Sequence, residues 1–381
     1  MKENYDYIIA GAGASGLSLL SYLLQEKKLL EKRILLIDKA QKNKNDRTFC
    51  FWQKEESPFE AVVKKTWKTL DFHTPEFSKA LDFEPFKYKM IQGLDLYNFC
   101  FQLIEKHDNV TFVLDEILEF KEGKVVGNSA TYTGEFVFNS ARYTINQQPG
   151  THHLLQHFKG WFLSSADPVF KESAPVFMDF RVDQVDGCSF MYIMPLSDHD
   201  ALAEYTLFSA SLLEQSEYDK LLDQYIRDTL GIGTYNTSHE EFGVIPMTNA
   251  QLPQMTSPNV INIGTAGGYS KPSTGYTFAF IQKYCRAIAQ NLAQKKHPLN
   301  GMNRGRSKYY YYDSIFLRVL EEQKIPAWKV FQSLFKHLPE ALVLNFLDEN
   351  TSFLEDLRVM NSVPKGTFIQ AALAELSPKF L

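Results

Sequence analysis

The sequence of 381 residues predicts an α/β fold: a parallel-sheet domain, an antiparallel sheet inserted into it, and C-terminal helices. Two observations predict this arrangement. Near the N-terminus an apolar strand, a glycine-rich turn, a helix and a second apolar strand follow one another, which is the order of a βαβ unit with parallel strands. In the middle of the chain, short strand-like runs are separated by turn residues, which is typical of an antiparallel sheet.

The elements follow in chain order. The parallel-sheet domain is expected to contain strands at 7–10, 33–38, 110–114, 136–139 and 260–264, and helices at 14–25 and from near Thr274. The inserted sheet is expected to contain strands at 176–182, 188–194 and 201–208, with turns at 186–187 and 197–198. We therefore assign 1–70, 96–150 and 251–300 to a nucleotide-binding domain, 71–95 and 151–250 to a substrate domain, and 301–381 to a helical region.

Composition excludes several classes of protein. A net charge of -5 gives no electrostatic reason to expect a nucleic-acid partner. The four cysteines are far apart, so neither a disulfide framework nor a zinc site is expected, and a reducing cytoplasm fits best. His153 and His157 are spaced like one helical turn but have no matching acidic or cysteine partner, so no metal site is expected.

The glycines of the first turn match the dinucleotide-binding fingerprint of a Rossmann-like domain. Gly11, Gly13 and Gly16 follow a strand and open a helix, and Asp38 ends the next strand about 22 residues later. Gly11 permits the tight turn, Gly13 lets the backbone approach a pyrophosphate, and Gly16 lets the helix pack on the strand. The helix N-terminus at Ala14 offers N–H groups to phosphates. These glycines also explain why the uncharged run 7–24 is neither a membrane span nor a signal peptide.

The fingerprint fits both NAD and FAD, and a second segment favours FAD. Gly264 and Thr265 follow the late buried strand, and Thr274 and Gly275 open the next helix. This segment resembles the late flavin-binding segment of flavoprotein monooxygenases and prenyl reductases. Those families usually have Asp where Thr265 stands.

Several further motifs together resemble the FAD-dependent lycopene cyclases. They occur in the family's order along almost the whole chain: 46–52 (DRTFCFW), 177–180 (FMDF), 186–187 (DG), 190–196 (FMYIMPL), 203–206 (AEYT), 243–247 (GVIPM) and 271–276 (KPSTGY). The family usually has two adjacent acids in the fifth motif, whereas here Tyr205 follows Glu204. Because neighbouring side chains of a strand point to opposite faces, we expect only Glu204 to face a substrate.

The resemblance implies a lycopene β-cyclase that closes the end rings of a linear carotenoid by acid catalysis, with no net redox change. Glu204 is the implied proton donor, FAD the implied cofactor in its reduced form, and NAD(P)H its reductant. Lys39 and Arg47 join the fingerprint residues in the expected cofactor site. The residues expected to contact substrate are Trp52, Tyr192, Pro195, Tyr205 and Phe208. Trp67, Trp161 and Phe190 are further candidates to stabilise a cation through their aromatic faces.

Two alternatives remain open at this point. One is a redox flavoenzyme of the same fold, a prenyl reductase or hydroxylase, which would consume NAD(P)H. The other is a non-catalytic carotenoid-binding protein.

The helical region raises a separate question about membranes. Ile325, Trp328, Phe331, Phe335 and Leu338 lie near one helical face. That face either packs on the core, which we favour, or lies in a membrane surface. We expect a cytoplasmic protein in peripheral contact with the inner face of the membrane, since the implied substrate dissolves in lipid, and no obligate protein partner.

Overall fold

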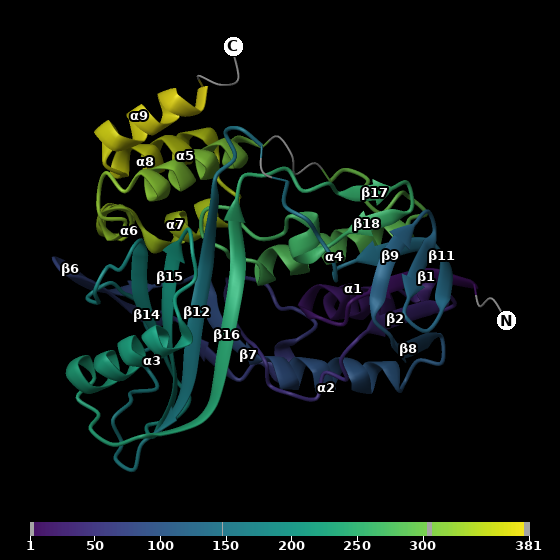
Figure 1. Ribbon diagram of the computed structural model, residues 1–381, viewed down its shortest axis with the longest axis horizontal. Coiled ribbons are helices and arrows are strands. Elements are labelled where there is room, and N and C mark those ends of the chain that lie inside the picture. The colour runs from purple at the N-terminus through teal and green to yellow at the C-terminus, as the bar shows by residue number, and fades with distance from the viewer. Residues whose placement is uncertain (1–3, 147, 303–306, 377–381) are drawn as a thin grey trace.

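The computed structural model describes residues 4–146, 148–302 and 307–376 and shows two sheets side by side (Figure 1). The first is an eight-stranded sheet with the path β17-β18-β11-β1-β2-β8, to which β10 and β9 are added through β11. Pairing is parallel from β18 through β8 along this path. Its strands are β1 (Asn4–Ala10), β2 (Ile34–Asp38), β8 (Val110–Leu114), β9 (Ile117–Lys121), β10 (Lys124–Gly127), β11 (Thr131–Asn139), β17 (Met255–Ser257) and β18 (Val260–Asn262).

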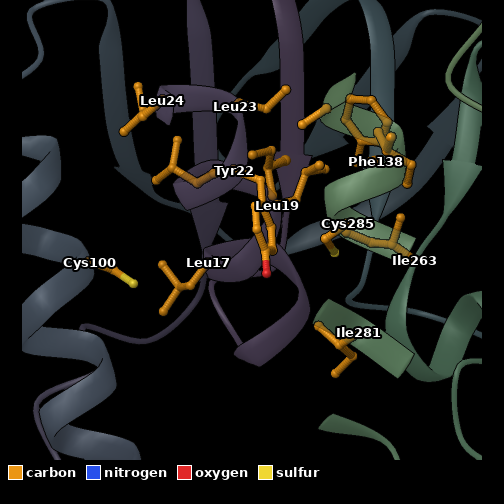
Figure 2. Packing of buried hydrophobic residues seen from close by; sticks show 14 of the residues in the cluster. Leu17, Leu19, Tyr22, Leu23, Leu24, Cys100, Phe138, Ile263, Ile281 and Cys285 are labelled. Atoms are coloured by element: carbon orange, nitrogen blue, oxygen red, sulfur yellow. The ribbon is translucent and has the colours of Figure 1, made fainter. Parts of the chain in front are cut away.

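The helix α1 (Ala14–Gln25) is almost entirely buried in this domain. It packs against α4 (Phe278–Ala293) and α2 (Gly93–Ile104). Figure 2 shows Leu17 pointing toward Cys100 of α2 on one side of α1, whereas Cys285 and Ile281 of α4 lie on the other side of the helix. Burying each such leucine contributes about 1.5–3 kcal/mol, which fixes the helix whose N-terminus meets the glycine turn.

The second sheet has seven strands in the order β16-β12-β15-β14-β13-β5-β6 and is mostly antiparallel. Its strands are β5 (Thr69–Thr74), β6 (Phe77–Asp82), β12 (His153–Ser164), β13 (Val176–Asp179), β14 (Cys188–Pro195), β15 (Asp200–Ser209) and β16 (Asn236–Thr248). A three-stranded sheet joins β3 (Thr48–Gln53), β7 (Lys87–Gln92) and β4 (Lys65–Trp67). The second sheet is thus assembled from the middle of the chain and from a hairpin inside the N-terminal third.

The two faces of the seven-stranded sheet are covered differently. One face packs against α3 (Gln215–Gln224). The other packs against the C-terminal helices, which gather at one end of the sheet in Figure 1. These helices are α5 (Lys308–Glu322), α6 (Trp328–His337), α7 (Glu340–Leu347), α8 (Phe353–Ser362) and α9 (Lys365–Leu376).

The apolar face of α6 packs on the core, as we favoured from the sequence. Phe331 stacks on Phe180 with ring centroids 5.2 Å apart, and Phe335 lies 5.0 Å from Phe72. Both side chains are buried. The alternative, in which this face enters a membrane, is wrong because the sheet already covers it.

Several expectations differ from the structure, and the strands expected at 176–182 and 260–264 end at Asp179 and Asn262. The helix expected from Thr274 begins at Phe278, because residues 272–274 form a turn and Gly275, which follows it, has a left-handed φ of +69°. His153 and His157 lie on the strand β12, so their spacing is not that of a helical turn. Among the described helices, none is both long and apolar enough to cross a bilayer.

Candidate active site

A cleft of about 860 Å³ lies at the carboxyl ends of the parallel strands. Most of the residues expected to bind a cofactor line it: Gly11, Gly13, Ala14, Asp38, Lys39, Arg47 and Thr265. Gly16 and Gly264 lie behind this lining.

Each fingerprint glycine has its own geometric reason. Gly11 has a φ of +107°, which a residue with a side chain rarely adopts. A Cβ on Gly16 would lie 1.9 Å from the carbonyl oxygen of Gly11, so only glycine lets α1 approach the turn. A Cβ on Gly13 would meet no protein atom within 4 Å, because that position borders the cleft. This arrangement could hold a pyrophosphate at the helix N-terminus.

Asp38 closes the turn from the next strand. Its Oδ2 accepts a hydrogen bond from the Ala12 N–H at 2.7 Å, and its Oδ1 accepts one from the Ala40 N–H at 2.8 Å. Lys42 Nζ lies 3.2 Å from Oδ2. These contacts hold the carboxylate at the wall of the cleft, where a ribose diol of a dinucleotide lies in this class of fold.

The four residues of the second expected flavin-binding segment, which runs from Gly264 to Gly275, do not all line the same space. Gly264 has a φ of +61°, and a Cβ there would lie 2.0 Å from Ser15 Oγ, so this glycine lets the segment pack against α1. Gly275 lines a smaller cavity beyond the cleft, and Thr274 lines an apolar chamber beyond that cavity. Of the four residues expected here to touch the cofactor, only Thr265 lines the cleft.

Glu204 lies in the smaller cavity, whose volume is about 130 Å³. Tyr192 lies directly opposite Glu204 on β14, so both side chains are on the same face of the sheet. The remaining lining residues are Thr48, Phe49, Cys50, Tyr88, Gln156, Phe158, Met194, Leu202, Ile245, Gly275, Tyr276, Thr277 and Phe278. Thr48, Phe49, Phe158, Ile245 and Thr277 also line the cleft, so the two spaces adjoin.

Burial sets the protonation of Glu204. Desolvation, followed by repulsion from the carboxylate of Glu241, raises the pKa of Glu204 to about 8. A hydrogen bond of 2.9 Å from Thr206 Oγ1 to Glu204 Oε1 opposes this rise. A carboxyl group with this pKa is mostly protonated at neutral pH.

A second carboxyl group, which we did not single out from the sequence, lies near the first. Glu241 of β16 lines the cleft and has 4% of its surface exposed. Desolvation raises its pKa to about 7, and a hydrogen bond of 2.9 Å from Thr48 Oγ1 to its Oε2 opposes that rise. Glu241 lies two residues before the GVIPM motif, on the same strand. This closeness to the motif was the one signal in the sequence that could have identified it.

Tyr205 lies behind the site, as the alternation of strand side chains predicts. It is fully buried on the opposite face, in the cluster that packs against α3. Pro195 ends β14 opposite Ala201 and does not line the cavity. These two residues are therefore not in contact with this cavity, contrary to their expected place in a substrate site.

The tryptophans and phenylalanines we expected also stand back from the cavity. Trp52 packs edge-on against Tyr276, with centroids 4.3 Å apart, and its Nε1–H donates to Asp348 Oδ1 at 2.8 Å. Phe208 packs against Phe190 in the core under the helices. None of the expected aromatic residues other than Tyr192 lines the cavity: Trp52, Trp67, Trp161, Phe190 and Phe208 are absent from its wall.

An apolar chamber of about 350 Å³ lies among the C-terminal helices. Tyr276 lines both this chamber and the cavity of Glu204. Its hydroxyl lies 3.4 Å from that of Tyr192. The cavity of Glu204 therefore adjoins the cleft on one side and is separated from the apolar chamber by the Tyr276 side chain on the other. Within the described ranges, no three His, Cys, Asp or Glu side chains are grouped to hold a metal ion.

The fold defines the class first: it is the Rossmann-like fold of flavin-dependent oxidoreductases and halogenases. A geranylgeranyl bacteriochlorophyll reductase-like protein from Thermoplasma acidophilum superposes with a TM-score of 0.61 at 14% identity, over 97% of this chain and 99% of the other.

Sequence comparison then gives the family. The profile of the lycopene cyclase protein family matches residues 6–373, and the chain belongs to this family. The lycopene beta-cyclase of Pantoea ananas is 25% identical over 98% of both chains. That of Pseudescherichia vulneris is 24% identical over 97% of both chains. The resemblance seen in the motifs is thereby confirmed.

Proposed function

We propose that this protein is an FAD-dependent lycopene β-cyclase that works by proton transfer, with no net oxidation or reduction. One arrangement carries the proposal: Glu204, whose pKa is raised to about 8, lies in a cavity that adjoins the cleft at the carboxyl ends of the parallel strands and shares Tyr276 with an apolar chamber. A carboxylic acid in such a place keeps its proton at neutral pH, because few water molecules are near to stabilise its ionised form.

The residues that line the cleft are suited to binding FAD. The turn at Gly11 and Gly13 leaves room for a pyrophosphate, α1 begins there without a capping side chain, and Asp38 borders the same space. Lys39 and Arg47 add positive charge to the lining. When bound and reduced, with NAD(P)H as the proposed reductant, FAD would supply a delocalised negative charge that stabilises a cation.

The chain's own residues account for the steps of ring closure. Glu204 gives its proton to the terminal carbon–carbon double bond of the linear end group, which leaves a tertiary cation. The electrons of a neighbouring double bond form the new ring bond, and the positive charge moves into the ring. The Glu204 carboxylate takes up one ring proton, which restores a double bond, so one proton enters the substrate and one leaves it, and no electrons are consumed.

The cavity wall stabilises the cation without reacting with it. Phe49, Phe158 and Phe278 line the cavity, and each aromatic face attracts a cation by about 0.5–2 kcal/mol. These rings come from β3, β12 and α4. They also exclude water, which would otherwise trap the cation as an alcohol.

The apolar chamber is the proposed place for the rest of the linear carotenoid. Its lining is dominated by aliphatic and aromatic side chains, among them Phe177, Phe331 and Val343. Met360 and Ile369 line the chamber and are also 39% and 58% exposed, so the chamber reaches the surface between α8 and α9.

That surface is the proposed membrane contact. Large apolar side chains are exposed along both helices: Phe353, Leu354, Leu357 and Met360 on α8, and Ile369, Leu373 and Leu376 on α9. A patch of this kind is rare on a protein surface without a partner. Because Met360 and Ile369 belong both to this patch and to the chamber lining, a lipid surface placed there would deliver a lipid-soluble substrate to the chamber.

The test is conversion of lycopene by the purified, FAD-loaded protein, reduced without oxygen and supplied with lycopene in vesicles. We expect β-carotene or its one-ring precursor, with far less NAD(P)H oxidised than rings formed. NAD(P)H consumed in proportion to product would instead indicate a redox flavoenzyme. Lycopene that is bound but left linear would indicate a carotenoid-binding protein.

A further inference from the structure

Glu241 and Glu204 lie on one line across three neighbouring strands. Gly160 of β12 pairs with Glu204 of β15 on one side and with Glu241 of β16 on the other. Residues in register across a sheet point to the same face, so both carboxyl groups stand on the face that carries the cavity.

Gly160 leaves the space between the two acids open. A Cβ at this position would lie 3.1 Å from Glu241 Cγ and 3.4 Å from Glu241 Oε1. The side chain of Glu241 therefore leans over the glycine, toward the strand that carries Glu204. Any larger residue at position 160 would stand between the two carboxyl groups.

Glu241 has one satisfied oxygen and one unsatisfied one. Its Oε2 accepts the hydrogen bond from Thr48, whereas its buried Oε1 has no hydrogen-bond partner among the described residues. A buried carboxylate oxygen without a partner is costly for a purely structural side chain. Its position in the wall of the cleft, in register with the strand position of Glu204, points to a role toward the reaction.

We propose that Glu241 is a positioning residue for this reaction: its negative charge keeps the transferable proton on Glu204 until the substrate takes it. The inference rests on the proposed function, since it assigns a partner to the acid of that reaction. Like charges that share a site cannot both ionise readily, so one proton stays on the pair.

The other titratable groups around Glu204 do not supply the negative charge that opposes its ionisation. Its titratable neighbours are Cys50 of β3, Tyr88 of β7, Tyr192 of β14 and Tyr276 before α4. Burial raises the pKa of all four, so they stay neutral near pH 7. On the side of Glu241, the charge of Arg47 favours the carboxylate and that of Asp46 opposes it.

The test follows the proton on Glu204 directly, by infrared difference titration of the FAD-loaded protein. The carbonyl band of the protonated acid is assigned by its loss in Glu204→Gln. In Glu241→Gln we expect the midpoint of that band to fall by about one pH unit, the size of a like-charge interaction between partly buried groups. The alkaline limit of cyclisation should fall with it.

Two control variants separate charge from structure. Glu240→Gln makes the same chemical change one residue away, on the opposite face, where Glu240 pairs with Lys159. It should leave the midpoint unchanged. Glu241→Asp keeps the charge, so the midpoint of Glu204 should stay close to its native value.

An unchanged midpoint in a folded Glu241→Gln protein would overturn the inference. If that variant does not fold, Thr48→Val serves in its place: without its donor, Glu241 ionises less readily, and the Glu204 midpoint should again fall. An unchanged Glu204 midpoint in Thr48→Val would likewise overturn the inference. Failure of the proposed function is distinct, because it shows as absent cyclisation in the unmodified protein, whatever the midpoints are.

Discussion

Thr206 donates a hydrogen bond from Oγ1 to Glu204 Oε1 over 2.9 Å, from two residues along the same strand. Side chains two positions apart share a face, so the bond follows from the strand itself. It stabilises the ionised form of an acid that burial keeps protonated. The protonation of Glu204 is therefore a balance of groups that can be removed one at a time.

Removing the donor gives the first prediction, on pH dependence. The reaction needs protonated Glu204, so cyclisation by the native protein should decline as pH rises through about 8. In Thr206→Val the carboxylate loses a stabilising bond, its pKa rises further, and the alkaline limit should move to higher pH. The check is the initial rate of ring formation from pH 6 to 10, and a shift to lower pH would contradict this account.

Stability should depend on pH through the same residue. The pKa of Glu204 is raised on folding, so the folded state holds the proton more tightly, and stability is lost as pH rises from about 4.5 to about 8. Glu204→Gln removes this dependence. The melting temperature of the variant should therefore gain on that of the native protein as pH rises, and a constant difference across this range would speak against a buried, protonated Glu204.

The glycine turn provides a matched pair of substitutions. At Gly13 the backbone is ordinary, with a φ of -84°, and an added side chain enters the open cleft. Gly13→Val should thus leave the melting temperature of the apoprotein near its native value and abolish flavin absorbance in the purified protein. Gly16→Val meets the Gly11 carbonyl oxygen at 1.9 Å and should destabilise the fold itself. If Gly13→Val still bound a full complement of flavin, the cofactor would not bind at the glycine turn.

The exposed apolar helices should bind lipid. Leu354 of α8 is 73% exposed, so Leu354→Asp is expected to weaken sedimentation with phospholipid vesicles several-fold while the fold is kept. Leu212 is 47% exposed and lies before α3, on the other side of the sheet. Leu212→Asp is the control and should sediment like the native protein. Equal binding by both variants would exclude α8 as the membrane contact.

Local patterns predicted the nucleotide-binding half of the fold well. The expected helix at 14–25 and strand at 110–114 have those bounds in the structure, because glycine turns and apolar runs are properties of neighbouring residues. Asp38 and Gly13 border one cleft for the same reason. The motif that contains Glu204 was found only through resemblance, since a lone glutamate on a strand has no signature.

The rest of the site depends on packing that the sequence does not display. Phe49, Phe158 and Phe278 are far apart along the chain and meet only because β3, β12 and α4 converge. Glu241 reaches toward Glu204 through a register between strands, not through spacing. The apolar periodicity of α6 is compatible with both a core and a membrane surface, and the sheet beneath it decides between them.

The central claim is that Glu204 transfers a proton to an alkene, and solvent deuterium tests it most directly. The reduced, FAD-loaded protein should convert lycopene in heavy water to a product with one deuterium in each new ring, found by mass spectrometry, and Glu204→Gln should form no ring while retaining its flavin. Rings formed in heavy water without deuterium, or formed at the native rate by Glu204→Gln, would contradict the account.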